Sequence, residues 1–168
     1  MAEIIKVQKE RLPKIKFIGK RYTDENRANG GFGHLWCEWF EKGWFDELEK
    51  LGQVPDIENG YLGFMRCYPN FEYWIGMFLQ PDTLVPEGFG SFDLDESDVG
   101  LCWIKGKDTE EDNIYDCQKC RKAIEANGMT EFRKNSSGNN IYFHVYGPRF
   151  VKPDEDGNKT MDYGFYLA

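Results

Sequence analysis

Residues 71–105 carry the strongest hydrophobic pattern of the chain. Within them, the segment FEYWIGMFL at 71–79 alternates its side chains in the way that a β-strand does. One face of this strand would hold Phe71, Tyr73, Ile75, Met77 and Leu79. The other face would also carry large rings, Trp74 and Phe78, beside Glu72. A solvated face would be polar, so we expect helices to cover one face and an apolar cavity to lie against the other, as is typical of a binding protein.

The rest of the chain repeats one order of elements: strand, helix, strand, strand. In the first half, we predict these elements at residues 13–22, 34–51, 61–67 and 71–79. In the second half, we predict them at residues 88–105, 112–127, 141–150 and 162–168. The first helix has apolar residues at spacings of three and four, which is typical of an amphipathic helix. Gly128 is a suitable stop for the second helix.

The two halves are expected to belong to one domain. The segment PDTLVPEGFG at 81–90 links halves that span about 13–80 and 88–168, and an Asp/Ser turn at 95–98 is expected to split the strand that follows. A chain of 168 residues can bury one sizeable core. The sequence therefore predicts a single domain of the α+β class.

Net charge and hydropathy limit the kinds of partner that this chain is expected to bind. The net charge is −8, which is the wrong sign for a protein that holds DNA or RNA through phosphates. The basic residues between positions 6 and 21 interleave with apolar strand positions, and we interpret them as a solvated face. No apolar stretch is long enough to span a bilayer, and the N-terminus lacks a signal-peptide core. We expect a cytoplasmic protein without a nucleic-acid or membrane partner.

The cysteines do not suggest a disulfide framework. Their number is odd and they are scattered, at Cys37, Cys67, Cys102, Cys117 and Cys120. Cys117 and Cys120 form a CxxC motif, but a structural zinc site would need a second pair of ligands. A redox pair would lie at a helix start after a strand, whereas this motif is predicted inside a helix. We interpret it as two helix residues one turn apart.

Other chemical motifs are weak. His34, Cys37, Glu38 and Glu41 share a helical face, but a di-metal site needs matching carboxylates on a second helix. The helix at 112–127 offers these only loosely, so we expect an exposed face and predict neither metal nor cofactor. The sequence contains no P-loop, Rossmann glycine pattern or HExxH motif.

Several segments together resemble the GyrI-like small-molecule-binding domain family. They are FEYWIG followed by VPEGF, a strand that ends in WIKGK, the segment IYFHVYGPRF, and the closing MDYGFYL. The family includes the effector-binding domains of multidrug-sensing regulators such as BmrR and of AraC-type regulators. The resemblance covers most of 13–168 and identifies the chain as a standalone member. It implies tandem βαββ modules whose strands form a shared antiparallel sheet with two main helices around a central cleft, which takes flat, lipophilic, often cationic ligands.

Two positions depart from the family pattern. The family often carries a glutamate, in a pattern like YFEVY, where this chain has His144. That carboxylate is the group expected to meet a ligand cation or to act as a base, so both roles are in question here. Gly164 stands where the family tends to place a tyrosine, so either Tyr163 or Tyr166 replaces that ring or the pocket is wider.

Strand alternation in IYFHVY separates an apolar face from a face of Tyr142, His144 and Tyr146. The second face would meet either solvent or the cleft, and aromatic faces attract flat and cationic groups. Glu72 lies beside aromatics in its strand, where desolvation would raise its pKa and make it a base or cation partner. The full set of candidate ligand-binding residues is Trp36, Trp39, Phe40, Glu72, Tyr73, Trp103, Tyr142, His144, Tyr146 and Tyr166.

Three functional classes follow. The first is a standalone binding protein, monomeric or weakly dimeric, that senses or sequesters a lipophilic aromatic molecule and could serve drug resistance. The second is a hydrolase that opens strained, cyclopropane-type rings in the same cleft, as the resemblance suggests. The third is the effector module of a transcription regulator, which would need a separate DNA-binding partner because a helix-turn-helix does not fit before the first predicted strand. His144 favours the binding protein, and whether the chain is an enzyme stays open.

Overall fold

The computed structural model describes residues 1–55, 57–58, 60–67, 71–134, 138 and 140–168. Its strands are β1 (Glu3–Leu12), β2 (Ile15–Tyr22), β3 (Tyr61–Cys67), β4 (Phe71–Leu79), β5 (Gly90–Leu94), β6 (Ser97–Gly106), β7 (Tyr142–Tyr146) and β8 (Lys159–Tyr166). Its helices are α1 (Gly33–Lys42), α2 (Trp44–Glu49), α3 (Cys117–Ala126) and α4 (Pro148–Val151), with a 3-10 turn at Asp24–Asn26.

The described strands form one antiparallel sheet, in the order β1-β6-β8-β7-β3-β4-β2-β5. The first half supplies β3, β4 and β2 outward from the centre, and the second half supplies β7, β8 and β6 in the matching order. The two halves meet where β3 pairs with β7, with Gly63 opposite His144. The α+β class predicted from the sequence is confirmed.

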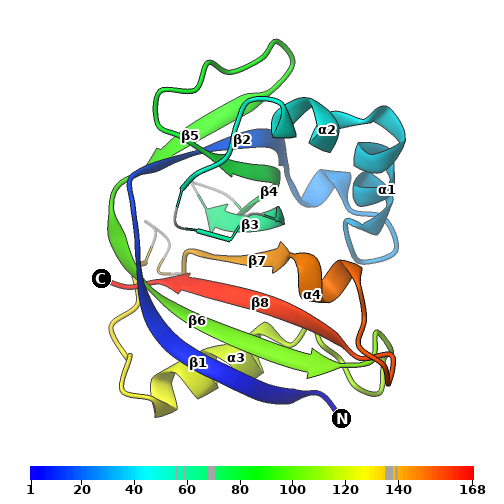
Figure 1. The fold of residues 1–168 in the computed structure, drawn as a ribbon, viewed down its shortest axis with the longest axis vertical. Helices are drawn as coiled ribbons and strands as arrows, with labels where there is room; N and C mark the ends of the chain where they lie inside the picture. The colour runs from blue at the N-terminus through cyan, green and yellow to red at the C-terminus, as the bar shows by residue number, and fades with distance from the viewer. Residues whose placement is uncertain (56, 59, 68–70, 135–137, 139) are drawn as a thin grey trace.

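Each half gives one strand to the edge of the other (Figure 1). β1 precedes β2 in the chain but pairs with β6 of the second half, with Val7 opposite Cys102. β5 precedes β6 but pairs with β2 of the first half, with Phe17 opposite Phe92. The sequence did not predict β1, because its apolar residues, Ile4, Ile5, Val7 and Leu12, do not keep a regular two-residue spacing, and only the segment from 13 onward has a clear strand pattern.

The sheet has two differently covered faces. Residues directly opposite each other on paired strands share a face, so Met65 and Tyr142 lie together on one face, and Phe64 and Phe143 on the other. α1 and α2 pack on the first of these faces in the first half, and α3 packs on it in the second half. We call the Met65/Tyr142 side the helical face and the Phe64/Phe143 side the opposite face. Both carry buried clusters, as the pattern at 71–79 predicted.

Three predicted element boundaries were wrong. The predicted helix at 34–51 is two helices, because Gly43 adopts a left-handed conformation (φ 69°) between them. The predicted helix at 112–127 begins only at Cys117, where the Asp116 carboxylate accepts a hydrogen bond from the Lys119 backbone N–H at 3.0 Å. The predicted strand at 141–150 ends at Tyr146, since α4 follows.

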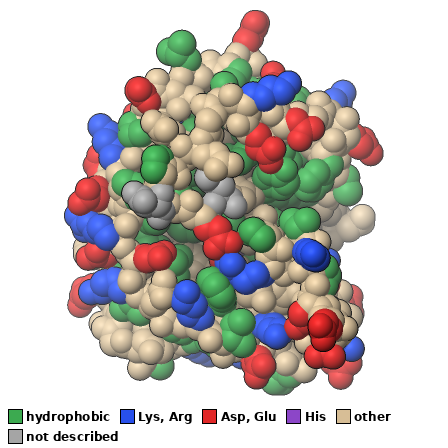
Figure 2. Space-filling view, in the orientation of Figure 1, with side chains coloured by type: hydrophobic (Ala, Val, Ile, Leu, Met, Phe, Trp, Pro, Cys, Tyr) green, Lys and Arg blue, Asp and Glu red, His purple; other side chains and the backbone are tan. Residues whose placement is uncertain are grey.

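Acidic and basic side chains are interspersed over the face shown in Figure 2 and do not gather into a basic patch there. In the part of the chain that the structure describes, no helix is long and apolar enough to cross a membrane. Nor do the described histidine, cysteine and acidic side chains form a group of three or more that could hold a metal ion.

Candidate ligand-binding site

A cavity of about 250 Å³ opens on the helical face over the junction of β3 and β7. Its walls come from both halves of the chain, and most of its side chains are aromatic. The lining residues are Arg27, Phe32, Met65, Phe71, Tyr73, Tyr115, Cys117, Tyr142, His144 and Tyr163. The cavity therefore lies where the two modules meet, as expected of the central cleft.

Two lining residues of this cavity, Tyr73 and His144, belong to a chain of hydrogen bonds that begins at Trp36. The indole Nε1–H of Trp36 donates to the Tyr73 hydroxyl at 2.9 Å, and the same hydroxyl lies 3.1 Å from Nε2 of His144. An indole N–H only donates, so the Tyr73 oxygen accepts from Trp36 and its own hydrogen is free to be donated to Nε2. Neutral His144 with its proton on Nδ1 fits this chain.

Gly63 makes room for that arrangement. It lies on β3 directly opposite His144 on β7. A Cβ at this position would lie 2.1 Å from Nε2 of His144 and 2.5 Å from the Tyr73 hydroxyl oxygen. Any other residue at position 63 would displace the two rings.

The lining groups of the cavity are largely uncharged. Burial lowers the pKa of His144 to about 4, so the imidazole is neutral at physiological pH. Burial also raises the pKa of Tyr73, Tyr146 and Tyr163 far above the ordinary value. The charged lining residue is Arg27, whose guanidinium lies over the ring of Phe32 at 4.5 Å. Desolvation therefore holds the pKa of His144 well below the value of about 6.5 that an unperturbed imidazole has.

Ring contacts continue the hydrogen-bonded chain on both sides. Phe32 stacks on Tyr73 with ring centroids 4.3 Å apart. Tyr146 packs against Trp36 at 4.4 Å and against His144 at 5.2 Å. The described structure thus brings five predicted residues together on the helical face. They are Trp36, Tyr73, Tyr142, His144 and Tyr146.

The other predicted residues lie elsewhere. Trp39 is fully buried beneath α1 and donates its Nε1–H to the Tyr22 hydroxyl at 3.0 Å, so it is a packing residue. Phe40 is 58% exposed on α1. Trp103 and Tyr166 lie on the opposite face of the sheet. Strand alternation gives the face of a strand residue only relative to its neighbours, which is why the prediction mixed the two faces.

Glu72 does not have the properties expected of a general base. Burial would raise its pKa, but hydrogen bonds from Trp74, Arg21 and Arg66 outweigh that effect and hold the pKa below the ordinary value. The two arginines lie 2.7 and 2.9 Å from its oxygens, and the side chain is on the opposite face from His144. A carboxylate fixed by two arginines is a structural ion pair rather than a replacement for the family glutamate.

Gly164 does not widen the cavity. A Cβ there would lie 2.3 Å from the ring of Phe143, so the phenylalanine ring fills the space above the glycine. This contact is on the opposite face. Tyr163, by contrast, does line the helical-face cavity.

Several lining residues were missed by sequence reasoning. Arg27, Phe32 and Tyr115 lie in connecting segments that have no periodic pattern. Cys117 was missed because the start of α3 was placed too early. The CxxC motif occupies the first turn of α3, not its interior as predicted, and the Tyr142 hydroxyl lies 3.7 Å from Sγ of Cys117.

Comparison with known proteins gives structural likeness without sequence likeness. No protein-family model matches the sequence, and no curated protein matches it. A Staphylococcus aureus MU50 protein described as a candidate bacterial transcription regulation protein is similar in structure, with a TM-score of 0.66 and 13% identity over 97% of this chain and 98% of that one. SAV2435 bound to tetraphenylphosphonium has a TM-score of 0.67 and 12% identity over 98% and 94%. A hydrolase from Listeria innocua has a TM-score of 0.50 and 9% identity over 97% and 92%. At these identities the likeness shows the fold.

Proposed function

We propose that this chain is a binding protein for a flat, lipophilic small molecule, neutral or cationic, that enters the helical-face cavity over β3 and β7. The observation that carries this proposal is the base of the cavity, where neutral His144, Tyr73 and Trp36 are joined by hydrogen bonds. Apart from Arg27, the walls of the cavity are uncharged and mostly aromatic, so a ligand can pack against apolar surface there at little cost in buried protein charge.

Two further observations support this proposal. SAV2435, which has the same fold, was solved with the lipophilic cation tetraphenylphosphonium. Tetraphenylphosphonium is tetrahedral, so it supports a lipophilic cation, and the preference for flat ligands rests on the segments that resemble the GyrI-like family. The family glutamate is replaced by His144, so cation–π attraction from the tyrosines would be the main source of cation preference. That attraction is weaker than a buried ion pair, and we expect modest discrimination between cationic and neutral planar ligands.

Quenching of tryptophan fluorescence tests the proposal, because a ring bound beside His144 lies close to Trp36. Titration with a rhodamine- or acridine-like compound should quench saturably. The Tyr142→Ala variant should weaken binding by about 10-fold, since it removes one aromatic wall. Phe40→Ala and Trp103→Phe are matched controls outside the cavity and should keep the wild-type affinity.

Two results would contradict the proposal. A chemically varied panel of planar compounds that never quenches saturably would mean that the aromatic side chains serve packing. Equal loss of binding in Tyr142→Ala and Trp103→Phe would place the ligand elsewhere or indicate a general loss of structure, which circular dichroism of the variants distinguishes.

Two other functions remain alternatives. A hydrolase of strained electrophiles in the same cavity is favoured by the fold shared with the Listeria innocua hydrolase. An effector module working with a separate DNA-binding partner is favoured by the fold shared with the Staphylococcus aureus protein. Mass spectrometry of a cyclopropane-containing compound after incubation with the chain separates a hydrolase from a binding protein, because only a hydrolase adds water to the ring.

A further inference from the structure

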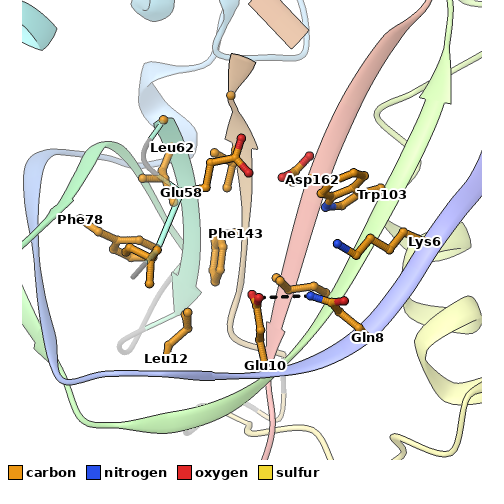
Figure 3. A pocket seen from close by; sticks show the side chains of 15 residues that line it. Lys6, Gln8, Glu10, Leu12, Glu58, Leu62, Phe78, Trp103, Phe143 and Asp162 are labelled. Carbon is orange, nitrogen blue, oxygen red and sulfur yellow. Dashed lines mark hydrogen bonds between the residues drawn. The ribbon is translucent and has the colours of Figure 1, made fainter. Parts of the chain in front are cut away.

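A second cavity, of about 140 Å³, lies on the opposite face of the sheet (Figure 3). β7 separates it from the helical-face cavity, since Phe143 and Val145 line the one while Tyr142 and His144 line the other. Figure 3 shows that its walls differ: Leu62, Phe78 and Phe143 lie on one side, and the polar residues of β1 lie on the other.

The apolar wall suits a compact hydrocarbon group. Leu62, Phe78 and Phe143 belong to a core cluster and are almost fully buried, and Val145 packs against that cluster. An apolar cavity of about 150 Å³ in a protein is large enough for a benzene ring. This cavity therefore has room for a single ring or a short branched chain.

The polar wall carries an excess of negative charge. Three lining carboxylates, those of Glu10, Glu58 and Asp162, face two cations, Lys6 and Arg149. Arg149 binds both oxygens of Glu58, at 2.9 and 3.1 Å, and Oδ2 of Asp162 at 2.7 Å. None of the described residues donates a hydrogen bond to Oδ1 of Asp162 or forms an ion pair with Glu10. Oδ1 of Asp162 and the carboxylate of Glu10 can therefore pair with a ligand cation.

Two cationic side chains of the protein lie against the indole ring of Trp103 at this cavity. The Lys6 ammonium lies 4.2 Å from the centroid of the indole ring, and the Arg149 guanidinium carbon lies 3.7 Å from it. Among the described residues, Lys6 forms no ion pair within 4 Å, although its positive charge acts to lower the pKa of the nearby Asp162 carboxyl. The long flexible side chain of Lys6 can move into solvent. The indole ring of Trp103 would then have room for a ligand ammonium group beside the carboxylates.

We propose that the opposite-face cavity is a second and independent binding site, for a compact primary amine on a single-ring or short hydrocarbon body. The body packs against Leu62, Phe78 and Phe143. The ammonium group takes the place of the Lys6 ammonium at Trp103, on the wall that carries Glu10 and Asp162. This ligand is smaller than the planar molecule proposed for the helical face and contacts different residues.

Isothermal titration of the whole chain with benzylamine at about pH 7.5, where carboxylates are ionised, tests the proposal. Benzyl alcohol and benzoate carry the same ring without the ammonium group. We expect benzylamine to bind at least about 5-fold more tightly than either, because the wall carries excess negative charge. The indole N–H signal of Trp103, assigned with Trp103→Phe, should shift on titration.

Glu10→Gln and Glu3→Gln form a matched pair, since both remove one exposed carboxylate of β1 but only Glu10 lines the cavity. Glu10→Gln should weaken benzylamine binding by about 3- to 10-fold, and Glu3→Gln should leave it within about 2-fold of wild type. Both positions are exposed, so folding should be kept. Equal binding of the three ring compounds, or equal effects of the two variants, would overturn the amine assignment.

The two cavities can be tested separately. Tyr142→Ala should leave benzylamine binding unchanged, whatever it does to planar ligands. If Tyr142→Ala abolishes benzylamine binding while Glu10→Gln does not, the amine enters the helical-face cavity and the second site is refuted. Failure of planar ligands to bind at all would refute the proposed function and leave this site standing.

Discussion

His144 is kept neutral by its surroundings rather than by a charged partner. The rings of Trp36, Tyr146 and Tyr163 lie around it, with centroids 5.2 to 6.3 Å away, and burial alone lowers its pKa to about 4. In the unfolded chain the imidazole titrates near pH 6.5. The unfolded state therefore binds more protons than the folded state between these two values, and stability rises with pH in that window.

We expect the free energy of unfolding to fall as the pH drops from about 6.5 towards 4, by up to about 3 kcal/mol from this residue. His144→Gln keeps a hydrogen-bonding side chain of similar size but does not titrate, so its stability should depend less on pH. Urea denaturation of both proteins across this range measures the difference.

His34→Gln is the matched control. His34 lies exposed on α1, away from the cavity, and its variant should keep the wild-type pH profile. If His144→Gln and wild type lose stability in parallel, the pKa of His144 is the same in the folded and unfolded protein, and burial does not hold the imidazole neutral.

At the residue level, alternation predicted which side chains lie together but not what they meet. Tyr142, His144 and Tyr146 do share a face, as predicted. On the other face of β7, Phe143 belongs to a buried core cluster and also lines the opposite-face cavity. The pKa of Glu72 was predicted with the wrong sign, because hydrogen bonds from Trp74, Arg21 and Arg66 outweigh its burial. Of these partners, Arg21 is 51 positions away in the sequence and reaches Glu72 through the pairing of β2 with β4.

At the element level, the contact between β3 and β7 depends on Gly63, which has no side chain. Gly63→Ala would place a methyl group between Nε2 of His144 and the Tyr73 hydroxyl. We expect it to destabilise the protein by about 2 kcal/mol, because overpacking displaces both rings and the hydrogen bond between them is lost. It should also weaken binding of planar ligands.

Gly33→Ala gives the comparison for this effect. Gly33 begins α1, and a Cβ there would meet nothing within 4 Å. Alanine favours helix, so this variant should be neutral or slightly stabilising in thermal unfolding. Equal destabilisation by the two variants would mean that the close approach at Gly63 does not carry the cost.

Element positions were predicted better than element ends. The strands at 13–22, 61–67 and 71–79 lie within two residues of β2, β3 and β4. Residues 112–116 were included in the predicted second helix because their composition does not oppose helix, whereas the Asp116 cap that starts α3 is a local contact without periodicity. The break at Gly43 is visible in sequence only as one glycine within an amphipathic pattern.

At the scale of the whole molecule, the exchanged edge strands join the halves. β1 pairs with β6 and β5 pairs with β2, so each half lacks one edge strand when the other is removed. We expect a single cooperative unfolding transition. Fragments 1–80 and 88–168 should each lack the native circular dichroism spectrum, and an equimolar mixture should recover it. A cooperative transition in either fragment alone would show that the halves are independent folding units.

The repeated element order was sufficient to predict two similar modules, and the resemblance to the GyrI-like family implied that they share one sheet. The element order was insufficient to predict the exchange of edge strands. β1 ends shortly before β2 and β5 ends shortly before β6, and the sequence does not say which edge of the sheet each of them joins. The paired residues of β1 and β6 lie between 85 positions apart, for Leu12 and Ser97, and 102 positions apart, for Glu3 and Lys105, which is beyond the reach of a local sequence pattern.

The crossing of β1 and β5 has a consequence for ancestry. Consider a half-length chain that consists of one such leading strand and one βαββ module. It can complete its sheet by lending its first strand to a second copy and accepting that copy's strand in return. The present chain has the connectivity that a reciprocal homodimer of this kind would acquire if its gene were duplicated and fused through a short linker such as 80–89. Cutting that linker in the folded protein should therefore leave two interlocked chains that stay associated.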